Sequence, residues 1–174
     1  MHQTIDKMKA LRLNEMAAIH HQRATQNLHQ DYSVDEYTAL LIDQEYEDRQ
    51  NRKTQRLLQS AKFKAAASIA QIDYKSTRGL NRDTINQLAL LTFISKNQNV
   101  IFTGPAGVGK CYLAQALGHQ ACLQGFKTLY HNTARFLAVL KFAKMDGTYL
   151  KQLARLAKWI YLSWMTLVYK NLTI

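Results

Sequence analysis

The sequence predicts an α/β fold of the P-loop type, with an incomplete parallel sheet and a helical arm before it. Residues 104–111 form a glycine-rich loop between a short apolar run and a helical pattern. Strand, loop and helix in this order are what a phosphate-binding loop requires. The single proline and three of the 7 glycines fall in this loop. Because proline and glycine interrupt helices, their scarcity elsewhere favours helices in the other regions. We therefore expect a partial P-loop domain at 73–158 and an arm at 1–72.

Helical periodicity and a capping signal define the arm, residues 1–72. Apolar residues recur at helical spacing between residues 4 and 26, which predicts one helix there: Ile5, Met8, Leu11, Met16 and Ile19. Ser33 and Glu36 form a capping box, with Ser33 as the N-cap of a second helix. The expected inner face of this second helix consists of Tyr37, Leu40, Leu41 and Tyr46. Residues 63–72 are alanine-rich and either end this helix or form a short one.

A basic stripe follows the acidic first half of the second helix. Its four cations lie at positions i, i+3, i+4 and i+7, and so on one face: Arg49, Arg52, Lys53 and Arg56. The formal net charge of the chain is +11, which favours an anionic partner, nucleic acid first. We interpret the stripe as a DNA-binding surface that contacts successive phosphates. A solvated basic face is the alternative that charge alone leaves open.

The second domain, residues 73–158, is predicted to hold one β-α-β unit. Its strands are expected at 100–103 and 127–131, joined by the glycine loop and a helix that ends near Gln124. A connection of this length implies a right-handed crossover between parallel strands. The other expected elements are a linker at 73–79, a helix capped by Asn81 or Asp83, a helix capped by Asn132 or Thr133, and a helix at 149–157.

The loop itself is expected to bind the phosphates of ATP. Its glycines let consecutive backbone N–H groups turn toward one concavity, and the helix behind it points its positive end there. Lys110 would reach the β- and γ-phosphates. The final position normally holds a Ser or Thr hydroxyl for Mg²⁺, but here it is Cys111, a poor ligand for a hard cation. The predicted ATP site, with its Mg²⁺ position weakened, comprises Gly104, Pro105, Ala106, Gly107, Val108, Gly109, Lys110 and Cys111.

The tail, residues 159–174, lacks the acidic strand that a P-loop ATPase needs. The carboxylates of that strand hold Mg²⁺ and orient the attacking water, yet no Asp or Glu follows Asp146. We therefore assign no catalytic and no metal-ligating residue. Trp164-Met165-Thr166 can be encoded only as TGG-ATG-ACN, which in a displaced frame reads GAT-GAC, or Asp-Asp. Our hypothesis is a truncated chain whose tail is translated out of frame, and a gene without an acidic strand in a neighbouring frame would refute it.

Several runs outside the loop resemble one family. Together with the loop they are similar to the IstB-like ATP-binding helper proteins of insertion-sequence transposases, which are related to the DnaC-type helicase loaders of the AAA+ class. The resemblance covers the chain to about Lys158. The runs are Asp6-Lys7-Met8-Lys9-Ala10-Leu11-Arg12-Leu13, Asp43-Gln44-Glu45 with Arg49-Gln50-Asn51-Arg52, Ile72-Asp73-Tyr74, Asn97-Gln98-Asn99-Val100, Ala116-Leu117-Gly118-His119-Gln120-Ala121-Cys122 and Gly147-Thr148-Tyr149.

The resemblance implies an AAA+-like ATPase that assembles on double-stranded DNA, recruits its transposase and directs the choice of target site. It implies ATP and Mg²⁺ as cofactors, with the metal held by the hydroxyl residue that Cys111 replaces and by a Walker B Asp. It places the arm in contact with DNA or with the transposase, and it leaves a homo-oligomer open. The expected function is therefore an ATP-binding helper of DNA transposition with impaired hydrolysis.

Two alternative functions remain beside this one. The first is a non-enzymatic remnant that keeps the DNA- or partner-binding arm. The second is a kinase that uses the same loop, and the arm and the family-like runs argue against it. No membrane partner is expected, because the N-terminus has no signal segment and the apolar run 159–169 is far shorter than the ~20 residues of a spanning helix. The two cysteines, Cys111 and Cys122, fit a reducing cytoplasm without a disulfide, and no histidine has zinc-ligand spacing.

Overall fold

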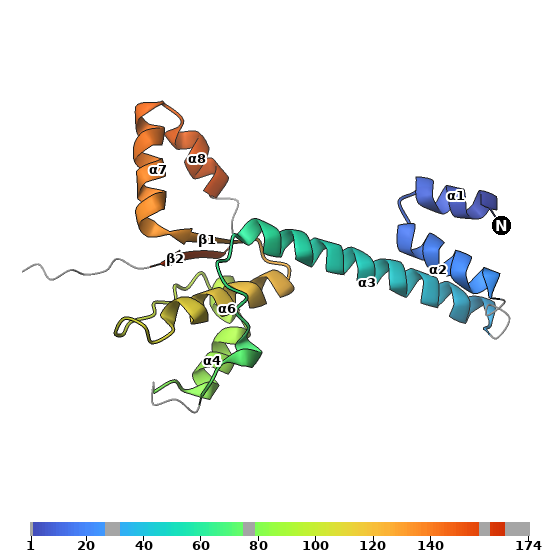
Figure 1. Ribbon diagram of the computed structural model, residues 1–174, viewed down its shortest axis with the longest axis horizontal. Coiled ribbons are helices and arrows are strands. Elements are labelled where there is room, and N and C mark those ends of the chain that lie inside the picture. Colours follow the sequence, from blue (N-terminus) through green and yellow to red (C-terminus); the bar gives the residue numbers. More distant parts are fainter. Residues whose placement is uncertain (1, 27–31, 75–78, 157–160, 166–174) are drawn as a thin grey trace, which may run out of the picture. The chain divides into compact units, whose positions relative to one another are not determined.

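A computed structural model describes residues 2–26, 32–74, 79–156 and 161–165 and divides the chain into two compact units, Met1–Lys53 and Thr54–Ile174 (Figure 1). The division falls inside one long helix, α3 (Val34–Ala61). In the first unit, α3 is preceded by α1 (His2–Ala10) and α2 (Asn14–Thr25). None of the described helices is long and apolar enough to cross a membrane.

The single helix expected at 4–26 is wrong, because the chain turns between α1 and α2. Arg12 adopts a left-handed conformation with φ of +60°. The N–H of Leu13 then donates to the carbonyl of Met8 at 2.9 Å, and the N–H of Arg12 donates to that of Lys9 at 2.9 Å. These two bonds are the Schellman arrangement that satisfies the last carbonyls of a helix. Glycine usually supplies this conformation, so an arginine there gives no signal in the sequence.

The start of α3 confirms the capping box. Ser33 N–H donates to Glu36 Oε2 at 2.9 Å, and Glu36 N–H donates to Ser33 Oγ at 3.3 Å. Leu41 is buried as expected, but Tyr46 is 62% exposed and does not belong to the inner face. The residue that lies there instead is Glu45, of which only 4% is exposed. The inner face of α3 in this unit is therefore partly ionic.

The second unit combines helices with a pair of parallel strands. The strands β1 (Thr128–Asn132) and β2 (Tyr161–Met165) run parallel, with Thr128 opposite Tyr161 and Asn132 opposite Met165. Most of the tail lies outside the described residues. The other elements are the 3₁₀ turn η1 (Ile69–Gln71), α4 (Arg82–Ala89), α5 (Thr92–Ser95), α6 (Lys110–Leu123), α7 (Thr133–Met145) and α8 (Tyr149–Leu156).

The strand expected at 100–103 is absent from the described elements, so the predicted β-α-β unit with an incomplete sheet around the loop is not confirmed. The segment nevertheless alternates like a strand, because Val100 and Phe102 pack against the core while Ile101 is 82% exposed. A strand requires a neighbour that completes its hydrogen-bond ladder. The described strands β1 and β2 pair with each other, and neither takes this segment as a partner.

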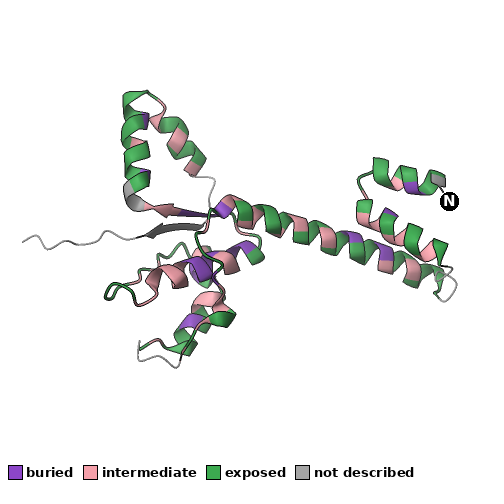
Figure 2. Ribbon diagram, in the orientation of Figure 1, coloured by how far each residue is buried: buried purple, intermediate pink, exposed green. Residues whose placement is uncertain are grey.

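The core of the second unit forms around α6, which carries more buried residues than any other described element of this unit (Figure 2). Leu117 and Ala121 of α6 pack with Leu91 and Phe93. Gly118 lies where α6 meets Phe63, and a Cβ at this position would stand 2.8 Å from the phenyl ring. A glycine is therefore needed for this close approach. The helix that carries the end of the glycine loop is thus held by packing on several sides.

Local capping signals in this unit are confirmed. Asn81 accepts hydrogen bonds from the N–H groups of Asp83 and Thr84 and begins α4, and Asn132 accepts from Arg135 N–H and begins α7. Gly125, with φ of +85°, follows the end of α6. The helix that starts at Asn81 is shorter than expected, because Leu91 adopts a left-handed conformation with φ of +57° and starts the separate turn α5.

Candidate functional site

The glycine loop leads directly into α6. Gly104, Gly107 and Gly109 have φ values of +141°, +81° and +98°, which side-chain-bearing residues rarely adopt. The first intrahelical bond of α6 runs from Leu113 N–H to the Gly109 carbonyl at 3.0 Å. The N–H groups of the three preceding residues have no intrahelical acceptor, as at every helix start. This end of α6 therefore offers N–H donors and a positive dipole to an anion.

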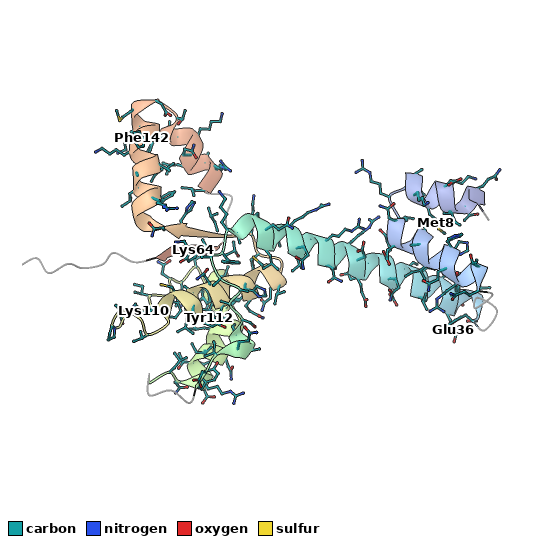
Figure 3. The ribbon with its side chains drawn as sticks, viewed as in Figure 1. Met8, Glu36, Lys64, Lys110, Tyr112 and Phe142 are labelled. Atoms are coloured by element: carbon teal, nitrogen blue, oxygen red, sulfur yellow. The ribbon has the colours of Figure 1, made fainter. Side chains whose placement is uncertain are left out.

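Lys110 reaches back over the loop. Its Nζ donates to the Gly104 carbonyl at 2.8 Å and also to the Pro105 carbonyl. Figure 3 shows Lys110 where the loop meets α6, and its ammonium group is thus held against the first residues of the loop. A phosphate bound there would exchange these carbonyl contacts for stronger charge-assisted bonds. The phosphate-binding role of Lys110 stays a prediction.

A cavity of about 540 Å³ adjoins the loop. This volume is within the range of small-molecule sites. Its walls are largely apolar, and its described charged residues are Lys110 and Asp73. One wall comes from the loop and α6. The other comes from the end of η1 with the two residues after it, and from Gly79 and Leu80, which precede α4. The lining residues are Gln71, Ile72, Asp73, Gly79, Leu80, Phe102, Thr103, Val108, Gly109, Lys110, Tyr112 and Leu113.

Two polar side chains of α6 fix the segment that forms one wall of this cavity. Gln115, 5% exposed, accepts the N–H groups of Lys64 and Ala65 at 2.7 and 3.1 Å. The hydroxyl of Tyr112 donates to the Ser68 carbonyl at 3.2 Å and accepts from Ser68 N–H at 3.3 Å. Buried backbone groups need such partners. The chain that leads into this wall is therefore held against α6.

The position that would bind Mg²⁺ holds a thiol. Cys111 is half-buried in the first turn of α6 and is a free cysteine. It lies near Tyr130, whose phenol pKa is raised by burial and then by the charge of Cys111. No group of three or more His, Cys, Asp or Glu residues within the described ranges could hold a metal ion. The observation that argues against Mg²⁺ at this position is the thiol itself, because this hard cation takes oxygen ligands.

The second cysteine has a different environment. Cys122 is fully buried, and burial raises the pKa of its thiol although hydrogen bonds with Thr128 act against this rise. Both cysteines are free, as the sequence predicted. A buried thiol with a raised pKa is unreactive. Cys122 is therefore a packing residue, and it has no part in the loop.

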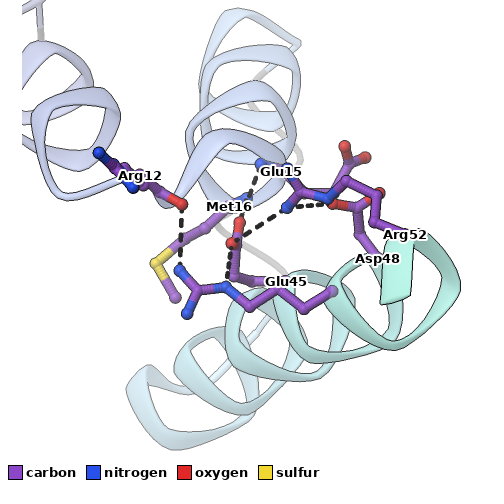
Figure 4. A network of polar contacts seen from close by, with 7 residues as sticks. Arg12, Glu15, Met16, Glu45, Asp48 and Arg52 are labelled. Carbon is purple, nitrogen blue, oxygen red and sulfur yellow. Dashed lines mark hydrogen bonds and ion pairs between the residues drawn. The ribbon is translucent and has the colours of Figure 1, made fainter. Parts of the chain in front are cut away.

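The basic stripe on α3 divides into two pairs. Arg49 donates to Glu45 at 2.7 Å and to the Arg12 carbonyl at 3.0 Å, and Arg52 forms ion pairs with Asp48 and Glu45 (Figure 4). Lys53 and Arg56 are exposed and form no ion pair with another residue in the described part of the chain. The first pair thus has a structural role that sequence reasoning missed.

Glu45 is the centre of that network. Its Oε2 accepts the N–H groups of Glu15 and Met16 at 2.9 and 3.2 Å, near the start of α2. Leu13, the N-cap residue of α2, makes no side-chain capping bond, so a carboxylate from α3 replaces it. The signal in the sequence was the i+4 spacing from Leu41, which places Glu45 on the inner face.

Comparisons with known proteins identify the family to which the chain belongs. A profile of the family described as "IstB-like ATP binding protein" matches residues 6–172, and so extends over most of the tail. The chain is 38% identical over 156 residues to the "Insertion sequence IS1162 putative ATP-binding protein" of Pseudomonas fluorescens, which covers 89% of this chain and 68% of that protein.

Two further relatives are similar over smaller shares of their length. The "Putative insertion sequence ATP-binding protein y4pL" of Sinorhizobium fredii is 35% identical over 85% of this chain and 60% of that protein. The "Insertion sequence IS21 putative ATP-binding protein" of Pseudomonas aeruginosa is 33% identical over 70% of this chain and 46% of that protein. The chain thus spans from about half to two thirds of these curated relatives.

Proposed function

Because the chain belongs to the IstB-like ATP-binding proteins of IS21-type insertion sequences, we propose that it is an ATP-binding helper of DNA transposition that binds ATP at residues 104–111. The observation that carries this proposal is the loop itself. Three glycines with positive φ lead into the start of α6, and Lys110 lies over them beside a cavity of about 540 Å³. Backbone N–H groups would hold the phosphates, and the apolar wall would take the base.

Hydrolysis of the bound ATP is expected to be impaired. The loop supplies a cation and N–H donors, but its last position holds the thiol of Cys111 in place of a metal-binding hydroxyl, and Asp73 is the one carboxylate among the described residues that line the cavity. Phosphoryl transfer in P-loop enzymes needs both to neutralise charge and to orient water. The alternative, a non-enzymatic DNA- or partner-binding remnant, would share this inactivity but would not require nucleotide.

A turnover assay tests this part of the proposal. We expect the purified chain to bind a fluorescent ATP analogue, while its release of phosphate from ATP, with Mg²⁺ and duplex DNA present, stays at the level of the Lys110→Ala variant. Turnover clearly above that level would contradict impaired hydrolysis. Absence of nucleotide binding would instead favour the remnant.

The fold proposed for the ATP-binding part is AAA+-like, with 100–103 as a strand beside the loop. The alternating burial of Val100, Ile101 and Phe102 supports this proposal. A further strand at its side would complete the ladder. The out-of-frame origin of residues 159–174 also remains a proposal, and sequencing the gene past Lys158 tests it.

Double-stranded DNA is the partner we propose for the exposed end of the basic stripe, Lys53 and Arg56. The two cations lie one turn apart on α3, and neither forms an ion pair within the described residues. The cognate transposase, assembly into a homo-oligomer and a cytoplasmic location are proposed from the family resemblance alone.

The salt dependence of DNA binding tests this surface. Replacing both Lys53 and Arg56 with alanine is expected to make the slope of log affinity against log salt shallower by about 2, because each cation that contacts a phosphate releases about one counterion. Duplex DNA titrations at several salt concentrations measure the slope. The double variant Lys144→Ala, Lys151→Ala removes the same charge from α7 and α8 and is the control. Equal slopes for the two variants would exclude a specific role for the stripe.

A further inference from the structure

The phosphate site described above holds a thiol at the position that usually binds Mg²⁺. The inference drawn from this thiol rests on the proposed function, nucleotide binding by residues 104–111. We propose that Cys111 makes this site indifferent to Mg²⁺, so that the chain binds nucleotide without its metal. The ligand class is accordingly a nucleoside triphosphate, which the site would bind equally well with or without magnesium.

The first support is the chemistry and place of Cys111. It follows Lys110 directly, in the first turn of α6, at the last position of the glycine loop. Mg²⁺ is a small, hard cation that takes oxygen ligands, and a thiol is a soft donor. The backbone carbonyl of Cys111 is itself engaged, since it accepts Gln115 Nε2 at 3.1 Å. Neither the side chain nor this carbonyl is therefore suited to the metal.

The second support is the scarcity of other oxygen ligands. Among the described residues that line the cavity, Asp73 supplies the one carboxylate, and it comes from the segment after η1 rather than from a strand end. The structure already gives Asp73 an interaction. No group of three or more His, Cys, Asp or Glu residues that could hold a metal ion occurs in the described ranges. A magnesium ion carried in by nucleotide would keep its waters and gain almost no contact with the protein.

The third support is that the loop can bind phosphate without a metal. Lys110 supplies a full positive charge, held 2.8 Å from the Gly104 carbonyl at the mouth of the loop. The first turn of α6, a helix of 14 residues, adds unpaired N–H groups and the helix dipole. None of these groups depends on Cys111, so loss of the metal contact leaves phosphate recognition intact.

Titration of a fluorescent ATP analogue, with excess Mg²⁺ or with EDTA, tests the inference. For the natural chain we expect the two affinities to agree within about twofold. For Cys111→Ser we expect Mg²⁺ to raise the affinity roughly tenfold, which corresponds to one restored contact with a charged group. Cys111→Ala is the matched control, because it removes the thiol without adding a hydroxyl, and it should remain indifferent.

The outcomes separate the inference from the proposed function. If Mg²⁺ strengthens binding by the natural chain roughly tenfold, the inference is wrong although the site binds nucleotide. If the natural chain and Cys111→Ser are equally indifferent, Cys111 is not the cause and the inference is wrong as well. If none of the variants binds the analogue with or without metal, nucleotide binding itself fails.

Discussion

Replacing Lys110 with alanine is expected to weaken ATP binding by roughly 100-fold. Lys110 is the one cation among the described residues that line the cavity, and its Nζ already lies over the loop. Each hydrogen bond between a charged group and phosphate is worth about 1.5–3 kcal/mol, and loss of about 3 kcal/mol in total corresponds to roughly 100-fold. If Mg²⁺ contributes as little to binding as we infer, it cannot compensate for the lost contact between Lys110 and the phosphates.

A fluorescence titration with an ATP analogue measures this effect, and a thermal unfolding curve is its control. Within the described residues, the hydrogen bonds of Lys110 Nζ go to two backbone carbonyls of its own loop, so its loss should leave the unfolding temperature nearly unchanged. Lys96→Ala, at the end of α5, removes an equal charge from an exposed position and should keep full affinity. A loss of less than about threefold for Lys110→Ala would place the phosphates elsewhere.

The parts of the structure that the sequence predicted are those set by local chemistry. The loop was predictable because glycines with positive φ and the following lysine are contiguous. The caps at Ser33, Asn81 and Asn132 were predictable for the same reason, since each acts on residues two or three positions away.

Features that depend on distant partners were not predictable. The segment 100–103 has the alternation of a strand, but its state depends on a neighbouring strand that local pattern does not specify. The turn at Arg12 lacks glycine or proline, and the Arg12 carbonyl is instead held by Arg49, 37 positions away. The basic stripe was correctly placed on one face of α3. Charge alone did not show that two of its four members bind acidic side chains.

Replacing Glu45 with alanine is expected to lower the free energy of unfolding of the first unit by about 2 kcal/mol, because buried backbone donors lose their acceptor while the half-exposed guanidinium of Arg49 can turn to solvent. The change leaves Glu15 N–H, Met16 N–H and Arg49 without their common acceptor (Figure 4). Urea titration followed by helical circular dichroism measures the loss. Glu47→Ala removes an exposed acid from the same helix and should change stability by less than about 0.5 kcal/mol.

The pH dependence of stability distinguishes the contribution of the Glu45 charge from the contribution of its side-chain packing. Burial acts to raise the pKa of Glu45, but hydrogen bonds from Arg49, Met16 and Glu15 outweigh it and leave the pKa lowered. A lowered pKa in the folded state stabilises the protein fully above the unfolded value of about 4.3, and this contribution is lost as the pH falls through the folded value. Glu45→Gln keeps an oxygen acceptor but cannot ionise, so it should be less stable than the natural chain at pH 7. The difference should shrink as the pH falls below about 4. A difference that stays constant from pH 7 to pH 3 would show that the carboxylate acts through packing alone.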